Sequence, residues 1–351
     1  MSSEKFYTEK AKKSKNTGYI SPERNPDEVR LFYNELQYPP SPKVNEVFAK
    51  YAENSSEMQF YGDPNASKLC AAIAEVLGID PEYVYADASS DRVLDMVHKA
   101  FLEGKRVAYP NPSYGFYKAW SEFYDVDATF IDLKEDLTLN LEDYRGFEAV
   151  VIANPNAPTG RAIALSEIED FVESNPDTLM VVDEAYIAFA DVKSAAPLVS
   201  KYENVLVTQT FSKAYALANM RIGYAIGNPD LLAAIRGVRS NTNEIPLSNL
   251  AIDAGAAAIR DQEYYRDIWQ KVKATRGKFT NELRALGIRV VDSEANFVFA
   301  EFPDGKGVYD YLSSKEFRVR LLGKRPYENY LRISIGTESQ MEEVIKCLKT
   351  F

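Results

Sequence analysis

Lys213 is the residue of this sequence best placed for covalent chemistry. It comes shortly after an apolar strand candidate, Val205–Thr208, so its side chain is expected to be partly buried. Burial lowers the pKa of a lysine and so favours the nucleophilic free amine. The nearby Ser212 and Arg221 could offer a hydroxyl and a guanidinium to a phosphate. This spacing favours an amine nucleophile beside an anion site, although a Ser-Lys pair alone is more commonly an ordinary surface feature.

A second chemical group, Asp183, ends the apolar run Leu179–Val182 and is followed by Glu184. Two adjacent acids at a strand end could bind a metal or cap a helix. A carboxylate there could also keep a pyridine-type ring nitrogen protonated, which makes the ring an electron acceptor. The span between Asp183 and Lys213 leaves room for one helix and one strand between them.

Two further loops combine rigid turns with residues that bind anions. Asn154–Gly160 carries two asparagines and two prolines directly after the apolar run Ala149–Ala153, which predicts a rigid turn at a strand end. In Ala86–Arg92, small and hydroxyl residues precede a helix candidate, where backbone amides and the helix dipole attract an anion. A plain helix cap would explain this second loop about as well.

The rarity of histidine and cysteine narrows the chemistry. His98 is the only histidine, and it falls within a helical pattern. Cys70 and Cys347 are the only cysteines, and their spacing fits neither a disulfide framework nor a zinc site. Ser-His, Cys-His and multi-histidine metal chemistry is therefore poorly supported. We expect no metal, so lysine, tyrosine and carboxylate side chains must supply any acid-base catalysis.

The composition is that of a globular chain. Of the 351 residues, 46% are hydrophobic and 26% are charged, and the net charge is −11. Such acidity argues against nucleic-acid binding, which requires a basic surface. No apolar stretch reaches the length of a membrane span, and the polar first residues lack the core of a signal peptide. We therefore expect a cytoplasmic location, with neither a nucleic-acid nor a membrane partner.

Short apolar runs alternate with amphipathic stretches from about residue 69 to residue 226. Many of these runs do not alternate in polarity, as expected of strands buried on both faces of a sheet. The pattern predicts strands at Arg106–Tyr109, Ala128–Leu133, Ala149–Ala153, Leu179–Asp183, Val205–Thr208 and Ile222–Ile226, and helices at Ala66–Leu77, Ser90–Leu102, Gly115–Tyr124, Leu165–Glu173 and Asp230–Val238. This order is typical of a mainly parallel α/β domain, in which ligands bind at the carboxyl ends of strands.

Beyond residue 245 the pattern becomes that of a smaller α+β domain. A long helical stretch over residues 247–286, with a possible break, precedes strands at Arg289–Val291, Asn296–Glu301, Arg318–Leu322 and Tyr330–Ile335, with helices at Tyr309–Ser314 and at the C-terminus. The expected organisation is an N-terminal arm (1–55) packing on the small domain, a large α/β domain (56–245) and the small α+β domain (246–351).

Together and in this order, the motifs resemble those of fold-type I pyridoxal-phosphate (PLP)-dependent aminotransferases of class II, most of all the histidinol-phosphate aminotransferase branch. The likeness extends from about Asn34 over nearly the whole chain. It rests on NPNAPTG (154–160), VVDEAY (181–186), FSKAYALANMRIGY (211–224) and LRISIGT (331–337). The resemblance implies an aspartate-aminotransferase-like fold and PLP as the cofactor.

By this resemblance, Lys213 bonds the cofactor as a Schiff base and moves the proton between the substrate and the cofactor. Asp183 pairs with the pyridine nitrogen, and Tyr186 contacts the phenolic oxygen. Tyr114 stacks on the ring. The remaining cofactor contacts implied by the resemblance are Ser89, Ser90, Asp91, Asn156, Thr210, Ser212 and Arg221.

The substrate and a partner subunit are expected to contact other parts of the chain. Arg332 would bind the carboxylate or phosphate of the substrate, for which a planar guanidinium is well suited. Arg320 is the candidate second anion contact, and Asn296 and Asn34 match positions near the substrate. Tyr61 matches a tyrosine that the neighbouring subunit lends to the cofactor phosphate, so the resemblance implies a homodimer.

The sequence departs from the family pattern at three places. Ala157 replaces the second asparagine before Pro-Thr-Gly, so either Asn156 reorients or Tyr186 alone contacts the phenolic oxygen. The family's Gly-Ser-Asp-Glu becomes Ser-Ser-Asp-Arg at 89–92, and its Asn-Glu-Asn-Pro becomes Asn-Glu-Leu-Gln at 34–37.

The resulting hypothesis is an aminotransferase that moves an amino group to 2-oxoglutarate by a ping-pong mechanism. Its amino donor would be histidinol phosphate or an aromatic or other amino acid. An alternative within PLP chemistry is a decarboxylase or lyase resembling threonine-phosphate decarboxylase, because the bond that breaks depends on its angle to the ring. A non-catalytic ligand-binding protein of the same fold is the alternative from another class, and intact Lys213 and Asp183 argue against it.

Overall fold

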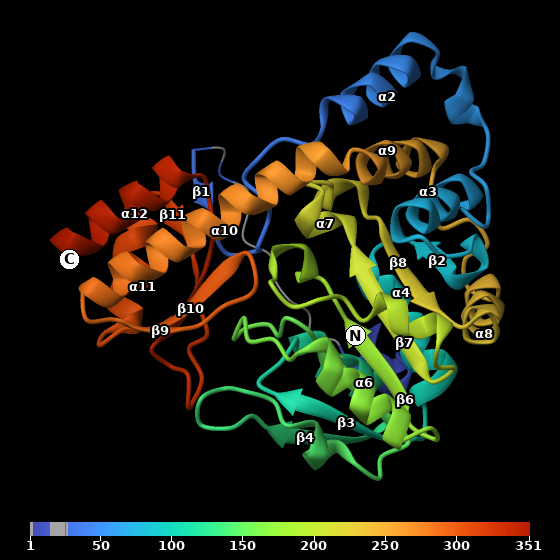
Figure 1. Cartoon of the computed structure of the whole chain (residues 1–351), viewed down its shortest axis with the longest axis horizontal. Coiled ribbons are helices and arrows are strands. Elements are labelled where there is room, and N and C mark those ends of the chain that lie inside the picture. The colour runs from blue at the N-terminus through green and yellow to red at the C-terminus, as the bar shows by residue number, and fades with distance from the viewer. Residues whose placement is uncertain (1–2, 15–24, 26) are drawn as a thin grey trace.

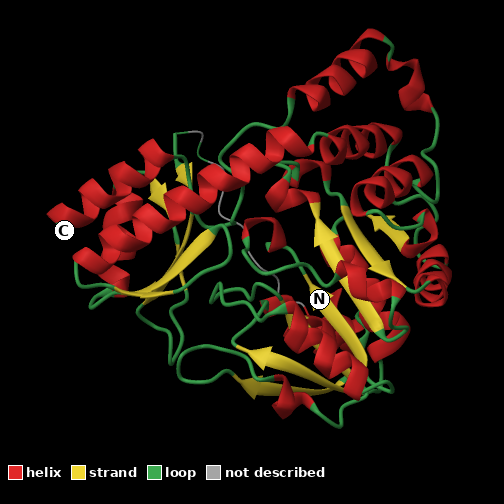
Figure 2. Ribbon diagram, viewed as in Figure 1, coloured by secondary structure: helices red, strands yellow, loops and turns green. Residues whose placement is uncertain are grey.

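The computed structural model describes residues 3–14, 25 and 27–351. A large sheet with helices on both faces forms one part of the molecule, and a small sheet with helices packed against it forms the other (Figures 1 and 2). Among the described residues, no helix combines the length and the apolar character that crossing a membrane requires.

The large sheet has seven strands in the order β2-β8-β7-β6-β5-β3-β4. Within this sheet β8 is antiparallel to both neighbours, and the other described pairs of strands are parallel. Only β2 was not expected from the sequence, because its four residues are too few to show a periodic pattern. The bounds are β2 (Val84–Asp87), β3 (Arg106–Asn111), β4 (Asp127–Asp132), β5 (Ala149–Ala153), β6 (Leu179–Asp183), β7 (Val205–Thr210) and β8 (Gly223–Gly227).

Both faces of this sheet are buried, which explains its unbroken apolar runs. In β5, Val150 and Ile152 belong to one hydrophobic core, whereas Ala149 and Val151 belong to the core on the opposite face. The helices of this part are α3 (Ser67–Leu77), α4 (Ser90–Val97), α5 (Gly115–Phe123), α6 (Leu165–Ser174), α7 (Phe211–Ala214), α8 (Pro229–Ser240) and α9 (Asn249–Arg260). A π-helical turn, His98–Leu102, directly continues α4.

The small sheet is antiparallel, in the order β12-β13-β10-β9. The strand expected over Arg318–Leu322 is divided, because β11 pairs with β1 of the arm whereas β12 pairs with β13. The bounds are β1 (Val29–Arg30), β9 (Arg289–Val291), β10 (Phe297–Glu301), β11 (Phe317–Arg318), β12 (Arg320–Leu321) and β13 (Tyr330–Ser334), with α11 (Gly305–Ser314) and α12 (Glu338–Thr350).

The long helical stretch expected over residues 247–286 breaks at Asp261 into α9 and α10 (Gln262–Ala285). α9 packs on α3 within the core of the large sheet. α10 runs onward beside the small sheet, with Tyr265 in the core of the large part and Val272 in that of the small part (Figure 1). A domain boundary after residue 245 would therefore separate α9 from the core that it shares with α3.

The N-terminal arm contacts both parts of the molecule. Its strand β1 pairs with β11, and Leu31 and Leu36 are buried in the core of the small part. The following helix α2 (Pro42–Glu53) packs on α9 instead. Short helices and turns complete the described chain at Ser3–Phe6, α1 (Glu9–Ser14), Ser55–Gln59, Pro81–Tyr83, Leu141–Tyr144, Ile187–Phe189, Ala196–Ser200 and Ala218–Met220.

Candidate active site

A cavity of about 970 Å³ lies at the carboxyl ends of β5, β6 and β7. Such strand ends are the usual ligand sites of α/β sheets. The cavity brings together most of the residues that the sequence assigned to the cofactor. Those that line it are Ser90, Asp91, Tyr114, Asp183, Tyr186, Thr210, Ser212, Lys213 and Arg221. Within the described ranges, no group of three or more His, Cys, Asp or Glu side chains could hold a metal ion.

Lys213 reaches the cavity from α7, the short helix that directly follows β7. Its Nζ donates a hydrogen bond of 2.6 Å to the carbonyl of Tyr33 in the arm. Burial lowers the pKa of Lys213 to about 8, and the nearby Arg332 guanidinium lowers it further in the same direction. An appreciable fraction of the free amine is therefore present near neutral pH, as a nucleophilic lysine requires.

Asp183 is the last residue of β6, is buried and lines the same cavity. Thr208 Oγ1 donates to its Oδ1 at 3.2 Å, and the Tyr117 hydroxyl donates to its Oδ2 at 2.9 Å. Burial raises the pKa of Asp183 to about 6, while these hydrogen bonds act in the opposite direction. The carboxylate is thus mostly ionised at neutral pH and is suited to hold a protonated ring nitrogen.

The start of α4 and the segment around α7 form a corner of the cavity that is suited to an anion. Ser90 and Asp91 occupy the first turn of α4, where free amides and the helix dipole favour negative charge. The Ser212 hydroxyl lines the cavity, is buried and has no hydrogen-bond partner among the described residues. Arg221 lies nearby and pairs with the Asp91 carboxylate at 3.3 Å.

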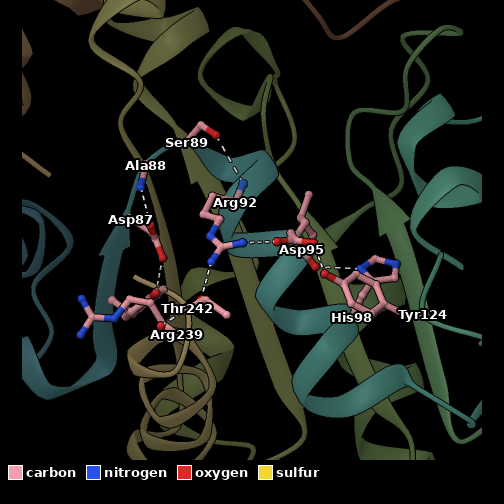
Figure 3. A network of polar contacts seen from close by, with 11 residues as sticks. Asp87, Ala88, Ser89, Arg92, Asp95, His98, Tyr124, Arg239 and Thr242 are labelled. Carbon is pink, nitrogen blue, oxygen red and sulfur yellow. Dashed lines mark hydrogen bonds and ion pairs between the residues drawn. The ribbon is translucent and has the colours of Figure 1, made fainter. Parts of the chain in front are cut away.

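Ser89 caps α4 and is not among the residues that line the cavity. Its Oγ accepts a hydrogen bond from the Arg92 amide at 3.3 Å, and its φ is 87°. Figure 3 shows the Arg92 side chain directed at Asp95 and Thr242, and the hydrogen bond to Thr242 Oγ1 measures 2.6 Å. Arg92, which replaces the family's glutamate, therefore connects α4 to the end of α8.

Two tyrosines supply aromatic and hydroxyl groups to the cavity. Tyr114 donates to Asp91 Oδ1 at 2.8 Å, which anchors its ring beside the anion-binding corner. The Tyr186 hydroxyl accepts a hydrogen bond from Asn34 Nδ2 at 3.0 Å. Burial raises the pKa of Tyr186, so its hydroxyl stays protonated and able to donate.

Asn156 does not reach the cavity, contrary to the role implied by the resemblance. Its Nδ2 donates to the Pro112 carbonyl and to Thr159 Oγ1, both at 3.0 Å. Its Oδ1 accepts from Ser113 Oγ at 2.7 Å, so all three contacts of the amide are with the loop after β3 and with Thr159. Ala157 lines the cavity instead, which leaves Tyr186 as the hydroxyl donor on this side.

The two predicted substrate arginines lie on the small sheet. Arg332, on β13, donates to the Phe32 carbonyl at 2.6 Å and lies 5.5 Å from the centre of the Phe297 ring. Arg320 is exposed on the neighbouring strand. Neither is among the residues that line the cavity, yet the charge of Arg332 lowers the pKa of Lys213.

Asn34 and Asn296 act together to anchor the arm. Asn296 Nδ2 donates to the backbone carbonyl of Asn34 at 3.0 Å, and the backbone N–H of Asn34 donates to Ser334 Oγ at 2.9 Å. Asn34 in turn donates to Tyr186, so Asn34 lies one hydrogen bond away from a residue of the cavity wall and Asn296 lies two away. Tyr61 lies outside it, with 88% of its surface exposed.

Several lining residues were not anticipated from the sequence. Arg30 and Glu35 line the cavity from the arm and form an ion pair of 3.0 Å, and Glu28 lines it as well. The sequence does contain a pattern that could have indicated them. Glu28 and Arg30 alternate with the apolar Val29 and Leu31, as in a strand with one polar face. Tyr117, the partner of Asp183, comes three residues after Tyr114 and was given no role from the sequence.

Comparisons with known proteins identify the family. The family model for aminotransferase class I and II matches residues 26–348. The histidinol-phosphate aminotransferase of Brachyspira hyodysenteriae is 37% identical over 92% of this chain and 91% of its own length. The structure of histidinol-phosphate aminotransferase from Sinorhizobium meliloti in complex with pyridoxal-5'-phosphate superposes with a TM-score of 0.79, at 24% identity over 92% of this chain and 91% of that one.

A neighbour of different activity shares the same fold. L-threonine-O-3-phosphate decarboxylase from Porphyromonas gingivalis superposes with a TM-score of 0.78 at 22% identity, over 92% of this chain and 99% of that one. Likeness of fold alone therefore does not separate transamination from decarboxylation. The match of sequence over almost the whole length does settle the family: the chain belongs to the aminotransferases of class I and II.

Proposed function

We propose that this aminotransferase uses PLP to transfer the amino group of histidinol phosphate to 2-oxoglutarate. One observation carries the proposal: a lysine with a lowered pKa and a buried carboxylate line the same cavity as an anion-binding helix terminus. These are the three groups that a phosphorylated pyridine aldehyde requires. The identity of the curated relatives over nearly the whole chain supports histidinol phosphate as the donor.

The residues present fit this cofactor. The buried Ser212 hydroxyl lacks a partner and lies beside the first turn of α4, so it can serve a phosphate together with Thr210 and Arg221. Gly223 permits the close packing of this corner, because a Cβ there would lie 2.0 Å from the Ser90 amide nitrogen. Asp183 would hold the pyridine nitrogen at the other end.

PLP, when bound, supplies an electron-poor ring that accepts the electron pair released at the Cα of the substrate. Lys213 would hold the cofactor covalently through Nζ and, as a free amine, take up and return the Cα proton. Its lowered pKa suits both tasks, because each requires the unprotonated amine. Asp183 would keep the ring nitrogen protonated, and Tyr186 would donate to the phenolic oxygen.

Arg332 and Arg320 are the proposed contacts for the anionic group of the substrate. A guanidinium can bind two oxygens of a phosphate or carboxylate at once, so the same pair can serve histidinol phosphate and then 2-oxoglutarate. The amino donor and the keto acid would thus bind to the same two arginines in turn, as a ping-pong mechanism requires. The N-terminal arm lies against this pair of arginines, because the Phe32 carbonyl accepts a hydrogen bond from Arg332.

We further propose that two copies of the chain associate, with Tyr61 of each reaching the cofactor phosphate of the other. Tyr61 exposes 88% of its surface, and the adjacent Met58 and Phe60 expose 56% and 64%. Three large apolar side chains exposed so close together are typical of an interaction site. A cytoplasmic location is proposed as well, because Cys70 and Cys347 are both free.

The test is a panel of amino donors supplied to the PLP-loaded protein with 2-oxoglutarate. Histidinol phosphate, phenylalanine and O-phosphothreonine are compared by the glutamate and the CO₂ that each produces. Glutamate formed fastest from histidinol phosphate, without CO₂, supports the proposal. Glutamate from phenylalanine alone would overturn the choice of substrate. Release of CO₂ from O-phosphothreonine without glutamate would assign the chain to decarboxylation instead.

A further inference from the structure

We infer that Tyr117 is a positioning residue for the cofactor, which fixes the Asp183 carboxylate through its hydroxyl and supports the Tyr114 ring through its own ring. The inference deepens the proposed function, because it rests on Asp183 as the partner of the cofactor's ring nitrogen. The sequence motifs named no residue that would hold the Asp183 carboxylate in place.

The first contact is the hydrogen bond to Asp183. Tyr117 lies on α5 and is fully buried, and its hydroxyl lies 2.9 Å from Asp183 Oδ2. Burial and the adjacent carboxylate raise the pKa of Tyr117 well above its usual value, so the hydroxyl always carries the proton. It therefore donates, and a donated hydrogen bond favours the ionised form of its acceptor. Tyr117 and Thr208 thus hold one carboxylate oxygen each.

The second contact is with Tyr114. The two rings meet edge to face, with centres 5.6 Å apart and planes at 85°. Such a pair is attractive because the positive edge of one ring faces the negative face of the other. Asp183 and Tyr114 both line the cavity, whereas Tyr117 does not. Tyr117 therefore supports two residues of the cavity wall from behind.

Other titratable groups also act on Asp183, and they define what Tyr117 adds. The charge of Asp91 on α4 raises the pKa of Asp183, and Glu184, Tyr114 and Tyr186 interact with it electrostatically. Burial and the charge of Asp91 favour the protonated acid, whereas the hydrogen-bond donors favour the carboxylate. Loss of the Tyr117 hydroxyl should therefore raise the pKa of Asp183. A protonated Asp183 accepts poorly from a pyridinium, so the cofactor should bind less tightly.

Tyr109 offers a matched control. It is fully buried, and its ring centre lies 5.8 Å from that of Tyr117. Its hydroxyl, however, pairs with His98 Nε2 at 3.1 Å and not with Asp183. Tyr109→Phe therefore removes one buried hydroxyl from the same aromatic cluster. A role of Tyr117 that is only structural predicts equal effects of the two substitutions on PLP binding.

The experiment measures PLP affinity by fluorescence titration between pH 5 and pH 8. The Lys213→Ala background is used so that affinity reflects non-covalent contacts. We expect Tyr117→Phe to weaken binding about tenfold near neutral pH, as for loss of a hydrogen bond to a charged group. The pH at which affinity falls on acidification should also move upward. Tyr109→Phe should change the PLP affinity by less than about twofold and should leave that pH unchanged. Equal losses in both variants, or no change with Tyr117→Phe, would refute the inference.

Two further measurements keep the result interpretable. Thr208→Val removes the other side-chain donor to Asp183 with little change in volume and leaves the Ala185 backbone amide in place. It should shift the pH dependence in the same direction even if Tyr117→Phe folds poorly. Infrared difference spectra against Asp183→Asn follow the protonated Asp183 carboxyl in the ligand-free chain. If the background protein binds no PLP, the proposed function fails. The infrared titration then still decides whether Tyr117 sets the ionisation of Asp183.

Discussion

Arg320 and Arg332 lie directly opposite each other on the antiparallel strands β12 and β13. Residues paired in this way leave the same face of a sheet, so the two guanidinium groups share one side. A phosphate or carboxylate can accept hydrogen bonds from two guanidinium groups that lie on one face. This pairing is the structural reason to expect the substrate phosphate or carboxylate at β13.

Replacing Arg332 with alanine tests this expectation. We predict that the KM for histidinol phosphate rises roughly 10- to 100-fold, because one or two charge-assisted hydrogen bonds are lost. The pKa of Lys213 should rise as well, since Arg332 lowers it. Steady-state kinetics over a range of pH measures both effects. Arg325→Ala is the control, because this arginine exposes 94% of its side chain and pairs only at 3.8 Å with Glu328. An unchanged KM in Arg332→Ala would refute the anion role.

Replacing Lys213 with alanine tests the covalent bond to the cofactor. The visible absorbance of the purified protein in the presence of PLP should disappear, because no other lysine lines the cavity among the described residues. Lys201→Ala is the matched control: it removes an exposed lysine that is paired with Glu169 just before β7. Its absorption spectrum should match that of the unmodified chain. Persistence of the visible band in Lys213→Ala would contradict the assignment of the nucleophile.

The sequence predicted where Asp183 and Lys213 lie in the fold, because each stands at or just after the end of a strand that is buried on both faces. Such strands are recognisable from their uninterrupted apolar residues. Tyr117 could not be assigned in this way, because its partner lies far away in the sequence and only the packing of α5 brings them together. Arg30 was missed for the same reason, since β1 has only two residues and its position depends on β11.

Asn156 illustrates a different limit. Its motif agrees with the family except at the next position, and the sequence left open whether its amide would turn to the cofactor. The answer depended on the Pro112 carbonyl and the Ser113 hydroxyl, which the fold places beside it. Local competition between hydrogen-bond partners of this kind depends on tertiary contacts, and no periodic pattern in the sequence records it.

The buried carboxyl of Asp183 should make the stability of the ligand-free chain depend on pH. Its pKa is raised from an ordinary value near 4 to about 6, so the folded chain binds this proton more tightly than the unfolded chain. The contribution of Asp183 to stability is therefore present below about pH 4 and is lost as the pH rises to 6. The loss should be on the order of 2–3 kcal/mol.

Urea unfolding between pH 4.5 and pH 7.5 measures this loss as the difference between the unmodified chain and Asp183→Asn, whose amide stays neutral throughout. Glu184→Gln provides a second comparison. Its carboxyl is buried with a pKa of about 7, so its contribution should continue to fall up to a higher pH than that of Asp183. If the difference between the unmodified chain and Asp183→Asn were constant over this range, Asp183 would have an ordinary pKa.

The backbone at Ser89 provides the last test, because this residue has a conformation that favours glycine. Its φ of 87° and ψ of 157° place a Cβ in a strained region, at a cost of about 1–3 kcal/mol. The family carries glycine at the corresponding position of its phosphate loop. Ser89→Gly relieves the strain, loses a few tenths of a kcal/mol of capping, and costs about 0.5–1 kcal/mol of additional chain entropy.

The net prediction for Ser89→Gly is a free energy of unfolding that is higher by about 1 kcal/mol, measured by urea denaturation of the ligand-free chain. Ser89→Ala separates the two contributions, because it removes the cap of α4 but keeps the Cβ. It should lower the free energy of unfolding by about 0.5–2 kcal/mol. Glycine and alanine should thus act in opposite directions at one position. If both destabilised the chain equally, the capping hydroxyl and not the backbone conformation would dominate at Ser89.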